Sequence, residues 1–77
     1  MFNDIMVYIH ITFNNNTEQE LSITEENWVQ HLIDTKDYLS IIELNCSNNE
    51  LTSLPKEICN LTNLKYFDCY NNKNILN

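Results

Sequence analysis

The feature that most constrains this chain is a repeat with a period of 23 residues in its C-terminal half. A shift of one period superposes four pairs of apolar or identical residues, namely Ile41 with Leu64, Leu44 with Phe67, Cys46 with Cys69, and Asn49 with Asn72. A period in the twenties is typical of solenoids, whose repeats each form one turn of a coil and bury their apolar face against their neighbours. The repeat therefore predicts parallel strands, one from each copy, lying side by side.

The first copy places its apolar residues in a fixed order. It reads Ile41-x-x-Leu44-x-Cys46-x-x-Asn49-x-Leu51 and continues as Thr52-Ser53-Leu54-Pro55-x-x-Ile58-x-x-Leu61. Over residues 38–73, about half of the chain, this pattern resembles the leucine-rich repeat family, in its short form with 23-residue repeats. The resemblance implies a solenoid with parallel strands on its concave face, an asparagine ladder formed by Asn49 and Asn72, and partners that bind the concave face.

Local physical chemistry gives the same elements without the resemblance. Leu44 and Cys46 alternate with polar residues, which is the period of two expected of a short strand that buries one face. An asparagine buried directly after such a strand can pair the backbone groups that the turn leaves open. Residues 54–61 carry apolar side chains four and three positions apart, which predicts a helical or 3₁₀ turn beginning at Pro55, with Cys59 on its outer side.

The second copy is unfinished. Position 74 is asparagine where the first copy has Leu51, and Ile75 and Leu76 arrive one residue late. Solenoids usually need at least three units and polar end caps. We therefore expect one complete and one truncated repeat in residues 39–77, with an open strand edge near Tyr66 to Cys69.

The first part of the chain, residues 1–38, predicts a cap. Apolar residues at alternate positions predict a strand, and they are Ile5, Val7, Ile9, Ile11 and Phe13. Residues 14–17 predict a turn, because asparagine tolerates the left-handed conformation, and Leu21 and Ile23 predict a returning strand. The predicted fold class is thus α+β, with an N-terminal β-hairpin and helix cap leading into a short leucine-rich repeat solenoid.

An amphipathic helix is expected between the hairpin and the repeats. Thr24 is expected to cap a helix that begins at Glu25, with Ile23 packing against Trp28 across the cap. The helix is expected to end near Lys36, and its apolar stripe consists of Trp28, Val29, Leu32 and Ile33.

Composition narrows the class of partner and the compartment. A net charge of −7 with no arginine argues against nucleic acid, which needs clustered cations. No apolar run approaches the roughly 18 residues of a membrane span, and the first residues lack the basic start of a signal peptide. Three cysteines without a CxxC pair fit a reducing cytoplasm. The bias towards asparagine and isoleucine is similar to repeat proteins of AT-rich genomes, such as giant DNA viruses and amoebae, which implies the host cytoplasm.

Neither catalysis, a metal nor a cofactor is expected. Cys46 and Cys69 occupy equivalent inward positions, where a small side chain packs well. A nucleophilic cysteine needs a histidine beside it, and no sequence feature links His10 or His31 to a cysteine. The cysteine spacings match no zinc motif, and a glycine-rich phosphate loop is impossible in a chain without glycine.

The exposed face of the predicted repeat strands is the functional candidate. It carries Glu43, Asn45, Tyr66, Asp68 and Tyr70, and tyrosine supplies rigid contact area that suits recognition. The sequence predicts a noncatalytic leucine-rich repeat protein that binds an unidentified protein partner through this face. Two other interpretations stay open. The five residues are simply solvated strand positions, or the chain is a truncated or self-associating structural fragment of a longer repeat protein, with no dedicated partner and with an open edge that pairs with another chain.

Overall fold

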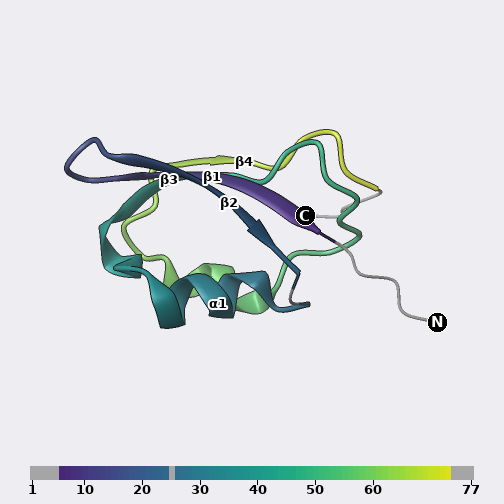
Figure 1. Ribbon diagram of the computed structural model, residues 1–77, viewed down its shortest axis with the longest axis horizontal. Coiled ribbons are helices and arrows are strands. Elements are labelled where there is room, and N and C mark those ends of the chain that lie inside the picture. Colours follow the sequence, from purple (N-terminus) through teal and green to yellow (C-terminus); the bar gives the residue numbers. More distant parts are fainter. Residues whose placement is uncertain (1–5, 25, 74–77) are drawn as a thin grey trace.

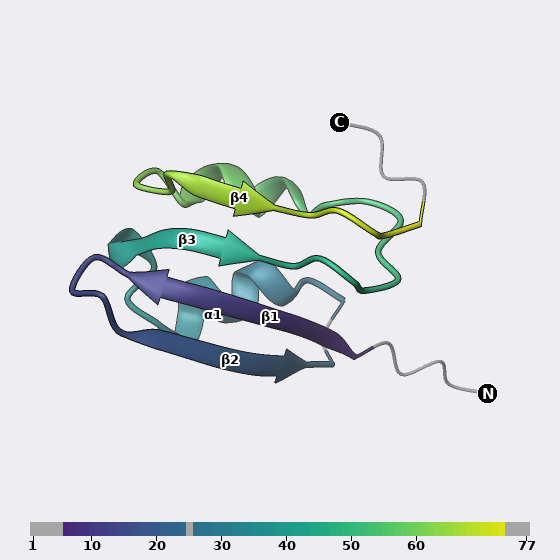
Figure 2. The same ribbon diagram turned by 90° about the horizontal axis from the view of Figure 1, so that it is seen from above.

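The computed structural model describes residues 6–24 and 26–73. Its elements in chain order are β1 (Val7–Phe13), β2 (Glu18–Ile23), α1 (Trp28–Thr35), η1 (Tyr38–Ser40), β3 (Ile41–Asn45), η2 (Lys56–Asn60) and β4 (Tyr66–Asp68), where η denotes a 3₁₀ helix. The four strands form one mixed sheet in the order β2-β1-β3-β4 (Figure 2). The α+β class predicted from the sequence is confirmed.

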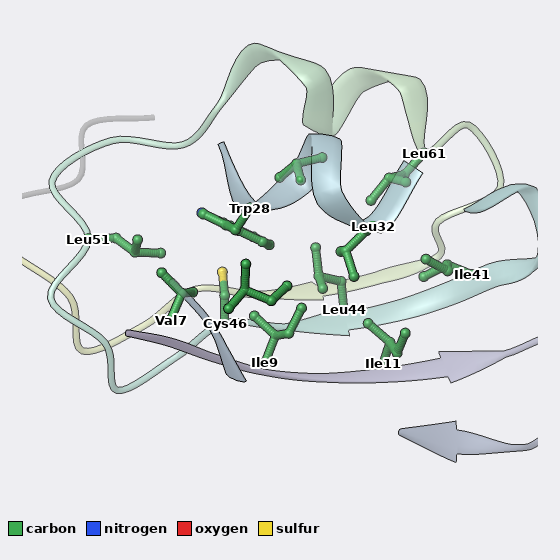
Figure 3. Close-up of a cluster of buried hydrophobic side chains, with 12 residues drawn as sticks. Val7, Ile9, Ile11, Trp28, Leu32, Ile41, Leu44, Cys46, Leu51 and Leu61 are labelled. Carbon is green, nitrogen blue, oxygen red and sulfur yellow. The ribbon is translucent and has the colours of Figure 1, made fainter. Parts of the chain in front are cut away.

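The sheet forms one layer, and α1 and η2 form a second layer on one side of it (Figure 1). The core lies between the layers and consists of Val7, Ile9, Ile11, Ile23, Trp28, Val29, Leu32, Ile41, Leu44, Cys46, Leu51 and Leu61. Side chains from β1 and β3 point towards α1, and Trp28 and Leu32 point back towards them (Figure 3). Each fully buried aliphatic or aromatic side chain contributes roughly 1.5–3 kcal/mol. The other face of the sheet, away from α1 and η2, is called the outer face below.

The predicted hairpin is confirmed. β1 pairs with β2 in antiparallel register from Val7–Ile23 to Thr12–Glu18, and Val7, Ile9 and Ile11 are buried as their alternation predicts. Asn16 takes the left-handed conformation, with φ of 70°, and its N–H donates to the Phe13 carbonyl. Asparagine accepts this backbone more readily than most residues, which explains how the turn closes without glycine. Ile5 lies outside the described residues.

The hairpin joins the sheet of the repeats directly. β1 pairs antiparallel with β3, with His10 opposite Asn45, Ile11 opposite Leu44 and Thr12 opposite Glu43. The register shifts between Thr12 and Phe13, where the pairing with β3 ends. The expected cap therefore extends the sheet with two strands, while α1 covers its inner face.

The 23-residue repeat corresponds to one step between neighbouring strands. β3 and β4 are parallel, and their pairs Glu43–Tyr66, Leu44–Phe67 and Asn45–Asp68 are each one repeat apart. This is the only parallel pair among the described strands, so the expected parallel arrangement is seen only in part and no solenoid is shown. Residues 74–77, where the second repeat loses its pattern, lie outside the described residues.

The helix begins later than the sequence predicts. α1 spans Trp28–Thr35, and its N-cap is Asn27, whose Oδ1 accepts a hydrogen bond from the Gln30 N–H at 3.1 Å. The prediction that Thr24 caps the helix is wrong, and Glu25 lies outside the described residues. Asn27 is the better cap because it directly precedes Trp28, which lies in the buried stripe with Val29 and Leu32. The end near Lys36 is confirmed, since Lys36 is the C-cap.

The predicted 3₁₀ turn is confirmed as η2, which spans Lys56–Asn60 and has Pro55 as its N-cap. Leu61 is buried, and Leu54 and Ile58 are partly buried against the same core. Cys59 lies on the exposed side, as expected.

Two asparagines hold the turns after β3 and β4. Asn49 is 9% exposed, and its Nδ2 donates to the carbonyls of Cys46 at 2.8 Å and Tyr8 at 2.9 Å, while its Oδ1 accepts from the Tyr8 N–H at 2.8 Å. Asn72 donates to the carbonyls of Cys69 and Cys46 and accepts from the Leu51 N–H. Both side chains thus bind their own turn and the preceding segment of the sheet, as rungs of one ladder would.

The turns themselves repeat in conformation. Asn48 and Asn71, one repeat apart, have φ of 62° and 56°, and the Asn71 Nδ2 donates to the Asn48 Oδ1 at 2.6 Å. Asparagine tolerates the left-handed region, so the Asn-Asn pair supplies both the turn residue and the ladder residue in each copy.

Replacing Asn49 with alanine tests the importance of these hydrogen bonds. We expect Asn49→Ala to lower the free energy of unfolding by about 2–4 kcal/mol, because the N–H and carbonyl of Tyr8 lose their side-chain partner and the Cys46 carbonyl keeps only its bond from Asn72. Asn63→Ala is the matched control, since the Asn63 side chain donates one exposed hydrogen bond to the Leu39 carbonyl, and it should cost about 1 kcal/mol or less. Urea unfolding followed by circular dichroism measures both, and equal losses would contradict the ladder's role.

Candidate functional site

The outer face of the sheet carries every second residue of each strand, because side chains alternate between the two faces. The strand pairing sorts these residues into rows that run across the sheet. One row is Glu18, Thr12, Glu43 and Tyr66, and the next is Glu20, His10, Asn45 and Asp68. Four of the five candidate residues are thereby placed in two adjacent rows on β3 and β4.

Tyr70, the fifth candidate, lies just past the end of β4. Its N–H donates to the Ser47 Oγ at 3.1 Å, and its carbonyl accepts from the Asn48 N–H at 3.1 Å. These bonds continue the β3–β4 alignment by two residues, so Tyr66, Asp68 and Tyr70 form one line. This line is called the β4 row below.

Tyrosines dominate the exposed surface of the outer face. Tyr66 and Tyr70 are 62% and 63% exposed, and Tyr8 on β1 is 61% exposed. Exposed large aromatic side chains are enriched in protein interfaces, where they contribute contact area and a hydroxyl group. Glu43 and Asn45 lie between β1 and β4 and are half-buried by their neighbours.

The charge of the outer face is negative. The His10 Nε2 lies 2.7 Å from the Glu18 Oε1, and its Nδ1 lies 3.7 Å from the Glu20 Oε1, so these two carboxylates have a partner. Within residues 6–24 and 26–73, neither the Glu43 nor the Asp68 carboxylate makes an ion pair or a hydrogen bond. Two carboxylates next to the tyrosines of β4 thus remain available to an external group.

A shallow depression of about 330 Å³ lies on the same face. It is lined by Tyr8, Ile9, His10, Glu20, Leu21, Ser22, Asn45, Ser47 and Asn48. Its polar lining comes from three strands and the turn after β3, so it is continuous with the outer face of the sheet.

A larger hollow of about 660 Å³ lies away from this face, between the start of α1 and residues 50–57. Its charged lining residues are Glu26, Glu50, Lys56 and Glu57. In the part of the chain that the structure describes, no group of three or more histidine, cysteine or acidic side chains is arranged to hold a metal ion.

The cysteines are in three different environments. Cys46 is buried, Cys69 is half-buried and Cys59 is exposed. Burial raises the pKa of the Cys46 thiol from 9.0 to about 12, and the nearby Cys69 and Asp68 add to this effect. The Cys46 Sγ lies 3.6 Å from the Asp68 carbonyl oxygen. Since the thiolate is the reactive form, Cys46 is a poor nucleophile.

The candidate site combines residues of the repeats with residues of the N-terminal hairpin, which the sequence analysis assigns to a separate cap. Glu43, Asn45, Tyr66, Asp68 and Tyr70 lie on the predicted face, but Tyr8 and His10 of β1 belong to it as well. Their alternation with Val7, Ile9 and Ile11 places them on the less apolar face of a strand. Only the pairing of β1 with β3, a contact between distant segments, places that face next to the repeats.

Comparisons of the chain with protein-family models, with curated proteins and with solved structures find no match. The resemblance to leucine-rich repeats therefore rests on the residues of the repeat pattern alone. No helix among the described residues has the length and apolar character needed to cross a membrane.

Thiol labelling tests the assignment of the cysteines. At about pH 8, iodoacetamide should alkylate Cys59 in the folded protein, whereas Cys46 should react only after unfolding, because it is buried and its thiol stays protonated. Mass spectrometry of proteolytic peptides after short labelling times measures each site. Cys59→Ser is the control that removes the fast reaction. Rapid labelling of Cys46 in the native protein would contradict its role as a core residue.

Proposed function

We propose that this protein is a noncatalytic binding module of the leucine-rich repeat type, which binds a protein partner through the outer face of its sheet. The observation that carries the proposal is the line of Tyr66, Asp68 and Tyr70. Its two tyrosines are each more than 60% exposed, and they lie beside the Glu43 and Asp68 carboxylates, which have no partner among the described residues. Isolated exposed apolar residues are ordinary, but aligned aromatic residues on a sheet face are typical of recognition surfaces.

The arrangement of the repeats supports the leucine-rich repeat part of the proposal. The strand register, the left-handed asparagines and the ladder asparagines all recur one repeat apart. The 3₁₀ helix η2 returns the chain from β3 to β4 on the helical side of the sheet (Figure 2), which is the path that one turn of a solenoid would take. In a longer solenoid, the same turn would be repeated on the open side of β4.

Selection from an unbiased library of displayed peptides tests the binding function even though the natural partner is unidentified. We expect selected peptides to bind the folded chain, and we expect the double variant Tyr66→Ala, Tyr70→Ala to weaken this binding at least tenfold, since both side chains are exposed anchors. Leu39→Ala is the matched control, because Leu39 is a 47% exposed apolar residue in η1, outside the outer face. Circular dichroism establishes that each variant is folded.

Two results would contradict the proposal. One is a library that yields no binder, and the other is a set of binders whose affinity is unchanged by the loss of both tyrosines.

A second candidate function, self-association, is favoured by the exposed end of the core. β4 is an edge strand, and Phe67, which points to the core side, is still 37% exposed because no further repeat covers it in the described part of the chain. An open edge with an uncovered apolar residue invites pairing with another chain. In this alternative the chain is a structural fragment that assembles with itself.

Light scattering coupled to size exclusion tests self-association directly. If β4 pairs with a second copy, the mass should rise towards that of a dimer as the concentration increases, and Phe67→Lys should restore the monomer, because lysine on an edge strand opposes pairing. Tyr8→Lys, which adds the same charge to the outer face away from the edge, is the control. A monomer mass at all concentrations would rule this candidate out.

A further inference from the structure

The geometry points to the chemical class of the partner. We propose that the β4 row binds an extended segment of another protein that adds to the free edge of β4 and presents lysine or arginine side chains at alternate positions. This inference rests on the proposed binding function and specifies which segment the face recognises.

The first argument is the pattern of the β4 row. Residues two apart on a strand share a face and lie about 6.5–7 Å apart, so Tyr66 and Tyr70 flank Asp68 on both sides along the outer face. Glu43 on β3 lies directly opposite Tyr66. A cation placed there meets an aromatic face and a carboxylate together, whereas a neutral side chain leaves the carboxylates unused and an acidic one is repelled.

The second argument is charge. On the four strands, the side chains of the outer face include four acidic residues, Glu18, Glu20, Glu43 and Asp68. No outer-face position of these strands is a lysine. Lys73, near the end of the described chain, lies 3.3 Å from Glu50 and is thus engaged elsewhere. The whole chain has a net charge of −7. The field over this face therefore attracts a positively charged segment and repels an acidic one.

The third argument is the backbone of β4. The Asp68 carbonyl accepts the Cys46 N–H, so the Asp68 backbone groups point towards β3, and by alternation the N–H and C=O of Phe67 point to the open edge. An extended segment alongside β4 can hydrogen-bond to these groups. Its side chains would then alternate, with cations on the outer face beside the β4 row and apolar residues on the inner side over Phe67, which is 37% exposed.

The same arrangement disfavours a second copy of the chain as the occupant. Pairing β4 with β4 would bring two Asp68 side chains into one small patch, and neither has an ion-pair partner in residues 6–24 and 26–73. Like charges close together on a sheet are destabilising. The edge of β4 therefore favours a basic strand over the β4 strand of a second copy, which carries Asp68.

Three synthetic peptides of nine residues provide the probe. The first alternates lysine or arginine with valine or threonine, the second has the same composition with its cations contiguous, and the third carries glutamate in place of each cation. Fluorescence anisotropy at physiological salt measures the affinity of each labelled peptide. We expect the alternating peptide to bind best, the contiguous one at least fivefold more weakly, and the acidic one not at all.

Two variants of the chain distinguish the β4 row from general attraction to an acidic protein. Asp68→Asn should weaken binding of the alternating peptide by about fivefold, which corresponds to the loss of one exposed ion pair. Glu50→Gln removes the same charge at an exposed place outside the outer face and should change the affinity less than twofold. Circular dichroism monitors the fold of both variants.

The outcomes separate this inference from the proposed function. Equal binding of the alternating and contiguous peptides, or equal effects of Asp68→Asn and Glu50→Gln, would overturn the inference. If library peptides bind in a manner that depends on Tyr66 and Tyr70 but are neither basic nor sensitive to Asp68→Asn, the face binds proteins of another chemistry. If no library peptide binds at all, the proposed function fails, and the inference fails with it.

Discussion

The buried side chain of Asn49 is the interaction on which the arrangement of this fold depends. It joins the turn after β3 to the backbone of Tyr8 in β1 by two hydrogen bonds, and it also closes its own turn on Cys46. The Tyr8 carbonyl, on the neighbouring strand, accepts a hydrogen bond from the Asn49 side chain. One repeat later, the Cys46 carbonyl accepts the equivalent hydrogen bond from the Asn72 side chain. The antiparallel strand β1 thus gives Asn49 the kind of backbone partner that the end of β3 gives Asn72, which explains how the hairpin can lie beside β3 without leaving these polar groups unpaired.

Much of this fold could be predicted because its signals are local. The alternation in β1, the asparagine-rich turn and the spacing of Leu54, Ile58 and Leu61 each depend on a few neighbouring residues, and the structure has the corresponding elements. The repeat also predicted the β3–β4 register, because two copies of one pattern stack with equivalent residues side by side. The helix start was misjudged because Thr24 and Asn27 are both good caps, and the choice depends on where Trp28 meets the core.

Which residues make up the candidate site was harder to predict, because the site also depends on contacts between segments that are far apart in the sequence. The five repeat residues follow from the period of two, but the contribution of Tyr8 and His10 requires the pairing of β1 with β3, segments about 30 residues apart. No local pattern encodes that pairing. The sequence shows only that β1 has one apolar and one mixed face, and the pairing with β3 places the mixed face beside the repeat residues. The same limit applies to the charge of the outer face. His10 pairs with Glu18 and Glu20 across the hairpin, and in the part of the chain that the structure describes Glu43 and Asp68 form no ion pair.

The two edges of the sheet differ in a way that bears on function. β2, at one edge, is a strand of glutamate and other polar residues apart from Leu21 and Ile23, and charged residues on an edge strand oppose pairing with another chain. β4, at the other edge, has only three residues, and its core-side residue Phe67 is incompletely covered. The acidic outer face and the incompletely covered Phe67 on the inner face both lie at β4. An added strand with basic residues on one face and apolar residues on the other would therefore be stabilised at this edge by contacts on both faces.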